Sequence, residues 1–247
     1  MSTFRFSTVA GAVCIAVICA GCSSQLAEQA TAERPAAAAS TAAGPSPLTP
    51  ATPTVDPNVV PGSVLKTYLP TNHTLPTGWK LSSVFKEADS GPTQLPRSPA
   101  PSPTVLPDCD QLAGHGTGAA VGSPAAYAGV GVVDSSAHEV GVAVNSYPAS
   151  EAAEVLSRLK VLEGICGTTY EPNSSGLLAN PVTVTVSAVD GPGEGGVLVK
   201  VDRKIYVGQE FVVMQIGDRV LSVTSDNKYG GFADVVALAK AIAPRVK

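Results

Sequence analysis

The chain has 247 residues and a formal net charge of −4, and 44% of its residues are hydrophobic. Its charged residues are spread along the chain without a basic run, which argues against nucleic-acid binding because phosphate backbones require a clustered basic surface. The same even spread argues against a strongly charged ligand that is steered from a distance.

Residues 1–21 are expected to form a signal peptide. Arg5 is the only charged residue in this segment, and the apolar run that follows is too short to span a bilayer core of about 30 Å. The small residues Ala20-Gly21 before Cys22 resemble a bacterial lipobox, with Cys19 at the position where leucine is usual. The resemblance implies that Cys22 carries lipid and anchors the protein to the outer face of the cytoplasmic membrane. Ordinary secretion and a retained membrane anchor are the alternatives.

The segment 22–62 is rich in Ala, Pro, Ser and Thr and has hardly any large apolar side chain. Such a composition buries too little surface to offset the entropy lost on ordering. We therefore expect a disordered, lipid-anchored tether, which would contribute no contacts to the core. The remainder, 63–247, is expected to be a single extracytoplasmic domain.

Alternating and helical patterns of apolar residues divide this domain into strands and two helices. Leu81 and Phe85 are the expected apolar anchors of the first strand, Ser150 is the expected N-cap of the first helix, and Gly164 is expected to end that helix. The unbroken apolar run from Phe211 to Met214 predicts a central strand buried on both faces. The expected strands are 78–87, 126–134, 138–147, 182–189, 197–207, 209–217 and 219–226, and the expected helices are 151–163 and 231–244. This order predicts an α+β fold, in which a mainly antiparallel sheet of about six or seven strands is backed by two helices.

Two cysteines remain for the exported domain once the signal peptide is removed and Cys22 is lipidated. These are Cys109 and Cys166, and two thiols in an exported domain predict one disulfide. Two buried free thiols are the alternative.

Serine and lysine patterns of penicillin-recognising enzymes occur in the wrong context. Ser63-x-x-Lys66 follows a Pro-rich segment rather than opening a buried helix, and Ser225-Asp226-Asn227 stands at a strand end with turn chemistry. No nucleophile, base and orienting group can be assembled, so we do not expect an enzyme.

Metal and cofactor sites are not expected either. The glycine-rich stretch 114–118 lacks the spacing of a phosphate-binding loop, and His115 with Asp108 and Asp110 offers too few ligands for a metal site. His138 is expected to be solvated. Trp79 is expected to pack in the core, and lining a ligand cleft is the alternative.

The segment from Cys109 to Cys166 and the closing strand and helix resemble a known group of domains. The strand 138–147, the helix ending at Cys166 and the final "GDRVLSV" strand are similar to the extracellular sensor domain of actinobacterial transmembrane serine/threonine kinases and to lipoproteins built on that domain. The resemblance implies a non-catalytic, sensor-like module that binds a small envelope ligand or an envelope protein. The alternatives are a passive structural envelope lipoprotein and a Mog1/PsbP-like lipoprotein, suggested by "LPTGWK", that binds a hydrophobic envelope molecule.

Overall fold

The computed structural model describes residues 56–95, 109, 122–172, 178–192, 195–203, 208–227 and 231–247. Thr52–Lys247 form one compact unit. The expected signal peptide, Cys22 and most of the expected tether lie outside the described residues, so what the sequence predicts of them stays a prediction.

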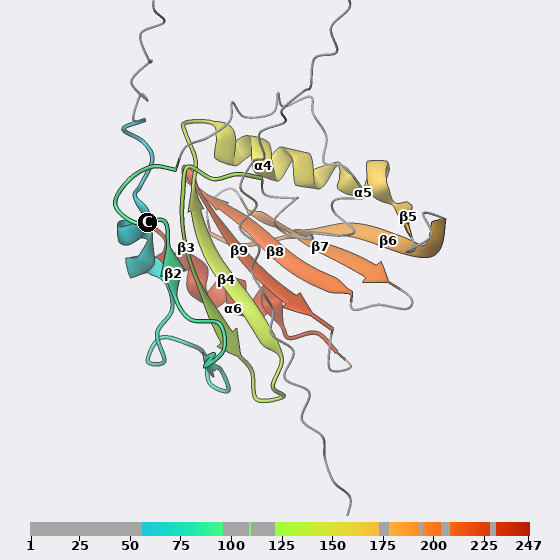
Figure 1. The fold of residues 1–247 in the computed structure, drawn as a ribbon, viewed down its shortest axis with the longest axis horizontal. Coiled ribbons are helices and arrows are strands. Elements are labelled where there is room, and N and C mark those ends of the chain that lie inside the picture. Colours follow the sequence, from blue (N-terminus) through green and yellow to red (C-terminus); the bar gives the residue numbers. More distant parts are fainter. Residues whose placement is uncertain are drawn as a thin grey trace, which may run out of the picture. The chain divides into compact units, whose positions relative to one another are not determined.

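An antiparallel sheet of nine strands forms the centre of this unit (Figure 1). Every neighbouring pair of strands is antiparallel, in the order β1-β3-β4-β9-β8-β7-β6-β5, and β2 also pairs with β3. The strands are β1 (Lys80–Leu81), β2 (Ala88–Asp89), β3 (Ala126–Val133), β4 (Glu139–Ser146), β5 (Thr168–Pro172), β6 (Leu178–Val189), β7 (Gly196–Arg203), β8 (Gln209–Ile216) and β9 (Arg219–Asp226). The predicted α+β class with an antiparallel sheet is confirmed, and the sheet has more strands than the six or seven expected.

Helices pack on both faces of the sheet. They are α1 (Gly62–Leu65), η1 (Lys66–Tyr68), α4 (Glu151–Lys160), α5 (Leu162–Cys166), α6 (Val235–Ile242) and η2 (Ala243–Arg245). On one face, which we call the α6 face, α6 packs against β8 and β9, and α1 packs against β3 and β4. On the opposite face, the α4 face, α4 packs against β6, β7 and β8, and α5 packs against β6. Figure 1 shows α6 behind the sheet, with α4 and α5 along its upper side.

Two separate hydrophobic cores result from this arrangement. The α6-face core joins α1 and α6 to β3, β4, β8 and β9, and the α4-face core joins α4 and α5 to β6, β7 and β8. Val155, Leu159 and Leu162 are fully buried in the second core. Complete burial of such a side chain contributes about 1.5–3 kcal/mol, so the helix pair is fixed to the sheet by apolar contact.

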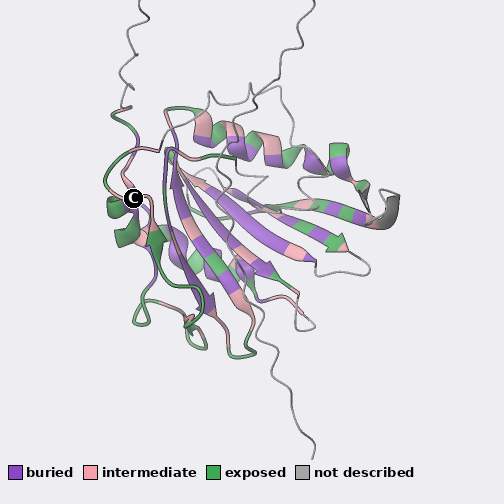
Figure 2. Ribbon diagram, in the orientation of Figure 1, coloured by how far each residue is buried: buried purple, intermediate pink, exposed green. Residues whose placement is uncertain are grey.

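The strand β8 takes part in both cores, as its unbroken apolar run predicted. Phe211 and Val213 face the α4-face core, and Val212 and Met214 face the α6-face core, all of them fully buried. Figure 2 shows this strand buried along most of its length. The alternation of β6 is also as expected, with Val182 and Val184 buried and the intervening threonines exposed.

Two strands at the far edge of the sheet are longer or additional. β6 already begins at Leu178, and β5 pairs with it although the sequence analysis expected no strand there. β5 ends on Pro172, which an edge strand tolerates because one side of its backbone needs no sheet partner.

The expected first strand, 78–87, is wrong. The structure forms two short strands, β1 and β2, with the segment 82–87 between them, and Phe85 is 56% exposed rather than an apolar anchor. The hydroxyl of Ser82 accepts hydrogen bonds from the N–H groups of Val84 (3.0 Å) and Phe85 (3.2 Å). A serine that accepts hydrogen bonds from nearby backbone N–H groups competes with sheet pairing, and here the segment after Ser82 forms a turn instead of a continuous strand.

The predicted ends of the first helix are also wrong. Ser150 precedes α4 but has φ of 72° and makes no capping hydrogen bond with its side chain. Gly164 does not end the helix, because α5 continues through it to Cys166 after a break at Val161. The final helix is shorter than expected, since α6 begins only after Asp234, whose carboxylate accepts a hydrogen bond from the Ala237 N–H (2.9 Å).

The packed domain begins before residue 63, which corrects the expected boundary of the tether. Val59 is 5% exposed and belongs to the α6-face core, and the Val60 N–H donates to the hydroxyl of Ser146 (2.9 Å). Two adjacent valines supply enough apolar surface to anchor the chain there, although the residues before them are those of a linker.

Candidate functional site

Among the described residues, the helices of the α4 face pack on β6, β7 and β8 and leave β3, β4 and β9 without a helix above them. The two helical layers are offset along the sheet and overlap only at β8, because α6 covers β8 and β9 from one face whereas α4 and α5 cover β6 to β8 from the other. Strands alternate their side chains between faces, so every second residue of β3, β4 and β9 points away from α6. These residues form the floor of the candidate site.

The floor consists of six small residues in a regular block. The strand registers place Gly129 opposite Ala143 and Gly131 opposite Gly141, and on the other side of β4 they place Ala143 opposite Ser222 and Gly141 opposite Thr224. We call the depression above this block the small-residue groove. Its members are Gly129, Gly131, Gly141, Ala143, Ser222 and Thr224.

One wall of the groove is the segment that carries Phe85. The Gly131 N–H donates to the Phe85 carbonyl (3.0 Å), and the Gly131 carbonyl accepts from the Ser82 N–H (2.9 Å). A Cβ on Gly131 would overlap the Cβ of Phe85. The glycine therefore allows this segment to lie directly on the sheet, with the Phe85 ring exposed at the edge of the groove.

On its other side the groove borders β8, whose large side chains on this face are covered by α4 and α5. The next residues across the sheet on β8 are Val213, opposite Ser222, and Phe211, opposite Thr224, and both belong to the core under α4 and α5. The side-chain size on this face thus changes abruptly from β9 to β8. The groove lies on the side of the small residues and extends along β4 and β9.

Two adjoining cavities occupy the groove. The larger, ≈ 470 Å³, extends over Gly129, Ala143, Asn145 and Ser222, and the smaller, ≈ 250 Å³, extends over Glu139, Gln209 and Asp226. Phe85, Gly141 and Thr224 line both, so the cavities are continuous. Volumes of this size suit small-molecule ligands.

Two polar side chains are buried in the larger cavity. Asn145 is 6% exposed and Ser222 is 5% exposed, and both line the cavity from neighbouring strands. Neither side chain has a hydrogen-bond partner among the described residues. The amide of Asn145 and the hydroxyl of Ser222 can each donate or accept a hydrogen bond, so both can contact a polar group of a ligand in the cavity.

The smaller cavity ends in two carboxylates. The Oε1 of Glu139 accepts a hydrogen bond from the Ser82 hydroxyl (3.2 Å), and the Oδ1 of Asp226 accepts one from the Gln209 amide (3.0 Å). Both partners are neutral, and in the described part of the chain no Lys, Arg or His forms an ion pair with either carboxylate. Negative charge therefore concentrates at this end of the groove.

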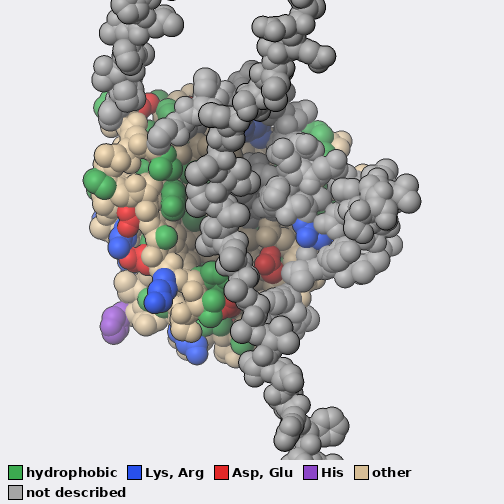
Figure 3. Space-filling model, in the orientation of Figure 1, with side chains coloured by type: hydrophobic (Ala, Val, Ile, Leu, Met, Phe, Trp, Pro, Cys, Tyr) green, Lys and Arg blue, Asp and Glu red, His purple; other side chains and the backbone are tan. Residues whose placement is uncertain are grey.

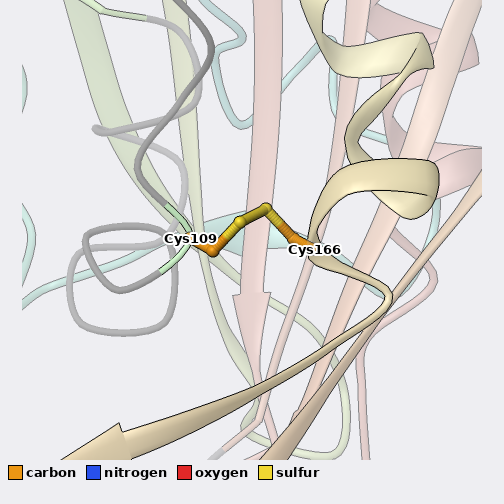
Figure 4. Close-up of a disulfide and its surroundings, with 2 residues drawn as sticks. All are labelled: Cys109 and Cys166. Atoms are coloured by element: carbon orange, nitrogen blue, oxygen red, sulfur yellow. A yellow bond between two sulfur atoms is a disulfide. The ribbon is translucent and has the colours of Figure 1, made fainter.

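Cys109 and Cys166 are joined by a disulfide, with Cα atoms 5.5 Å apart (Figure 4). Cys166 ends α5 and is buried in the α4-face core, and Cys109 packs against the same core. The bridge therefore attaches Cys109 to the end of α5.

The residues of the serine–lysine hypothesis have other partners. Ser63 is exposed on α1, and the ammonium group of Lys66 pairs with Glu87 (2.7 Å) and Asp89 (3.6 Å). The hydroxyl of Ser225 is on the α6 face and accepts from the Ala233 N–H (3.3 Å). The structure thus does not bring these groups together, and Asn227 accepts from the Gly208 N–H as part of a turn.

His138 is not solvated, contrary to the expectation. Its Nδ1 lies 2.8 Å from Oδ2 of Asp134, and both side chains are largely buried at the β3–β4 turn. Burial raises the pKa of Asp134, but the hydrogen bonds from His138 and from the backbone of His138 and Ser136 outweigh burial, and the pKa of Asp134 lies below its usual value. The indole of Trp79 packs against the α6-face core and also lines a separate hollow near this turn.

Within the described ranges, no group of His, Cys, Asp and Glu side chains is arranged to hold a metal ion. His115, Asp108 and Asp110 lie outside those ranges. Of the helices in the described part, none is long and apolar enough to cross a membrane. Figure 3 shows acidic and basic side chains intermixed on the visible described surface.

The sequence contains a signal for the groove that the apolar periodicity used to predict the strands does not reveal. Gly129 and Gly131 alternate with buried alanine and valine on β3, and Gly141 and Ala143 do so on β4. When the residues that face one side of two paired strands are all small, that side of the sheet has no layer of large side chains. Glycines at such positions permit close approach of a ligand or another backbone.

No family model and no curated protein matches the chain. Among solved structures, the extracellular domain of PknH from Mycobacterium tuberculosis is similar, with a TM-score of 0.44 and 14% identity. The similarity covers 76% of this chain and 95% of that domain.

Proposed function

We propose that this protein is a non-catalytic, sensor-like binding module of the cell envelope, and that it takes up a small, largely apolar ligand in the small-residue groove. The observation that carries the proposal is the groove itself, whose floor of glycine, alanine, serine and threonine is bordered by Phe85 and by the large side chains of β8. Asn145 and Ser222, both buried in it, supply polar groups that fix a ligand's orientation. A passive structural lipoprotein has no need of such a cavity.

We further propose that lipid on Cys22 holds the module at the outer face of the cytoplasmic membrane. The support is the apolar segment before Ala20-Gly21-Cys22, together with the Cys109–Cys166 bridge, since structural disulfides are typical of exported proteins. Replacing Cys22 by Ala is expected to release the protein from membranes or to leave an uncleaved precursor. Unchanged acylation and unchanged membrane fractionation would contradict the anchor.

The binding proposal is tested by filling the groove without disturbing the fold. A Cβ on Gly141 would have no atom within 4 Å and would point into both cavities, so Gly141→Val occupies the space that a ligand needs. The matched control is Thr185→Val, on an exposed position of β6 on the α6 face. Residues 23–247 of the wild type and of both variants are incubated with envelope lipid extract, and retained small molecules are identified by native mass spectrometry.

The wild type and Thr185→Val are expected to retain the same compound, and Gly141→Val is expected to lose it while keeping its melting temperature. Equal retention by all three proteins would place any binding outside the groove. If none of them retains a compound, a passive structural role is the better interpretation.

A further inference from the structure

We propose that the ligand carries a protonated amine, and that Glu139 and Asp226 hold this group in the smaller cavity while the apolar body lies along the larger one. The inference rests on the proposed function, because it assigns a chemical class to the ligand of the same groove. The two ends of the small-residue groove differ in their lining residues. The larger cavity is lined mainly by glycine, alanine and valine, with Lys86 as the one charged residue among its described lining residues, whereas both carboxylates line the smaller one.

The strands place the two acidic residues side by side. Val140 is opposite Ser225 in the β4–β9 register, so the preceding Glu139 and the following Asp226 are neighbours at the same end of this pair. Both line the smaller cavity. Two negative charges on adjacent strands repel each other, and a bound cation offsets this repulsion because it attracts both carboxylates.

The groups that bind these carboxylates orient them without neutralising them. Ser82 donates its hydroxyl to Glu139, and Gln209 donates its amide to Asp226. Ser82 belongs to the segment that forms the groove wall, and Gln209 is on β8, so the two partners hold the pair from opposite sides. Each carboxylate has a second oxygen that a ligand's ammonium group can use.

Phe85 provides an additional contact for a cation. Its side chain is 56% exposed and lines both cavities, at the point where the apolar part and the acidic part of the groove meet. The face of an aromatic ring attracts an ammonium group through its negative electrostatic potential. An exposed ring beside two carboxylates favours a cation over an anion or a neutral hydroxyl.

Buried polar groups at the other end support a ligand rather than an empty acidic patch. Asn145 and Ser222 are buried in the larger cavity and have no side-chain hydrogen-bond partner within the described part of the chain. They lie beyond the floor residues Gly141 and Thr224 from the carboxylates. The complementary molecule is therefore elongated, with an ammonium group at one end, an apolar body and a polar group that reaches Asn145 or Ser222.

The test uses three probes of the same chain length, namely decylammonium, decanol and decanoate, each below its micelle-forming concentration. Residues 23–247, labelled with ¹⁵N, are titrated with each probe, and Kd is obtained from the amide shifts of Gly141 and Thr224. Decylammonium is expected to bind most tightly and decanoate most weakly. Glu139→Gln and Asp226→Asn are each expected to raise the Kd of decylammonium about two- to fivefold, the range of a partly exposed ion pair, and to leave that of decanol unchanged.

Asp202→Asn is the control for net charge, because Asp202 is exposed on the α6 face of β7. It is expected to leave all three Kd values unchanged. Equal binding of decylammonium and decanol, or an unchanged decylammonium Kd in both acidic-site variants, would refute the amine while leaving the groove as a binding site. Absence of shifts with all three probes would refute the amine and the groove together.

Discussion

Gly131 and Gly141 lie directly opposite each other on β3 and β4, yet only Gly141 has room for a side chain. A Cβ on Gly131 would overlap Phe85, whereas a Cβ on Gly141 would meet no atom within 4 Å. The two glycines therefore have different roles in the same groove. Gly131 brings the wall segment onto the sheet, and Gly141 keeps the floor open.

This difference predicts opposite effects of the same substitution. Gly131→Ala is expected to lower the free energy of unfolding by about 1–3 kcal/mol, because the added methyl group forces the Phe85 segment away from β3. Gly141→Ala is expected to be neutral or to stabilise the fold by up to about 1 kcal/mol, because alanine reduces the entropy of the unfolded chain. Urea unfolding followed by circular dichroism measures both. Equal destabilisation by the two substitutions would show that the segment 82–87 does not rest on Gly131.

The disulfide predicts a large loss of stability on its removal. The bridge joins residues that are 57 apart in sequence. Closing a loop of this length lowers the entropy of the unfolded chain and so raises its free energy by up to about 4 kcal/mol. The double variant Cys109→Ala/Cys166→Ala is expected to unfold at lower urea concentration by an amount within that limit. Alanine suits the site because Cys166 is buried in an apolar core.

A reductant provides the control for this experiment. Dithiothreitol is expected to lower the urea midpoint of the wild type and to have no effect on the double variant. A wild-type midpoint that does not respond to reductant under denaturing conditions would mean that the bridge contributes nothing to stability.

The Asp134–His138 pair predicts a contribution to stability that depends on pH. Because the pKa of Asp134 is lower in the folded than in the unfolded chain, its carboxylate stabilises the fold fully above the unfolded pKa of about 3.8, and this stabilisation is lost as pH falls through the folded pKa. Asp134→Asn is expected to lower the free energy of unfolding at pH 7 by about 1 kcal/mol and to flatten the acid limb. Asp202→Asn is the control for net charge. Thermal unfolding between pH 2 and pH 7 gives both profiles, and an unchanged acid limb in Asp134→Asn would contradict the assignment.

The parts of the fold that the sequence predicted are those fixed by long apolar patterns. The strand β8 followed from its run of large apolar residues, and β6 followed from the alternation of valine with threonine, because in both cases burial decides the structure. The segment 78–87 has two apolar anchors at strand-like spacing, and this pattern was overruled by hydrogen bonds of a single hydroxyl, that of Ser82. Hydrogen bonds between a side chain and the nearby backbone cannot be predicted from the spacing of apolar residues.

The groove could not be predicted because it depends on which helix covers which face. Gly141 and Ser222 are far apart in sequence, and each by itself is an ordinary residue of a strand. They line one groove because α6 covers β9 from one face while, among the described helices, α4 packs on β6 to β8 and not on the other face of β9. A sequence pattern gives the two faces of a strand but not the element that packs on each of them.

The anchoring of Val59 in the core predicts where the tether can be cut. The chain 56–247 is expected to melt at the same temperature as 23–247, since both keep Val59 in the α6-face core and the hydrogen bond from Val60 to Ser146. The chain 63–247 lacks both contacts and the hydrogen bonds between Asp56 and Gln94, and it is expected to lose about 2–4 kcal/mol of unfolding free energy. Val59→Ala in 56–247 separates the apolar contact from the hydrogen bonds and is expected to reproduce part of the loss. Equal melting of all three lengths would show that the domain needs nothing before residue 63, whereas a lower melting temperature for 56–247 than for 23–247 would mean that residues 23–55 also pack on it.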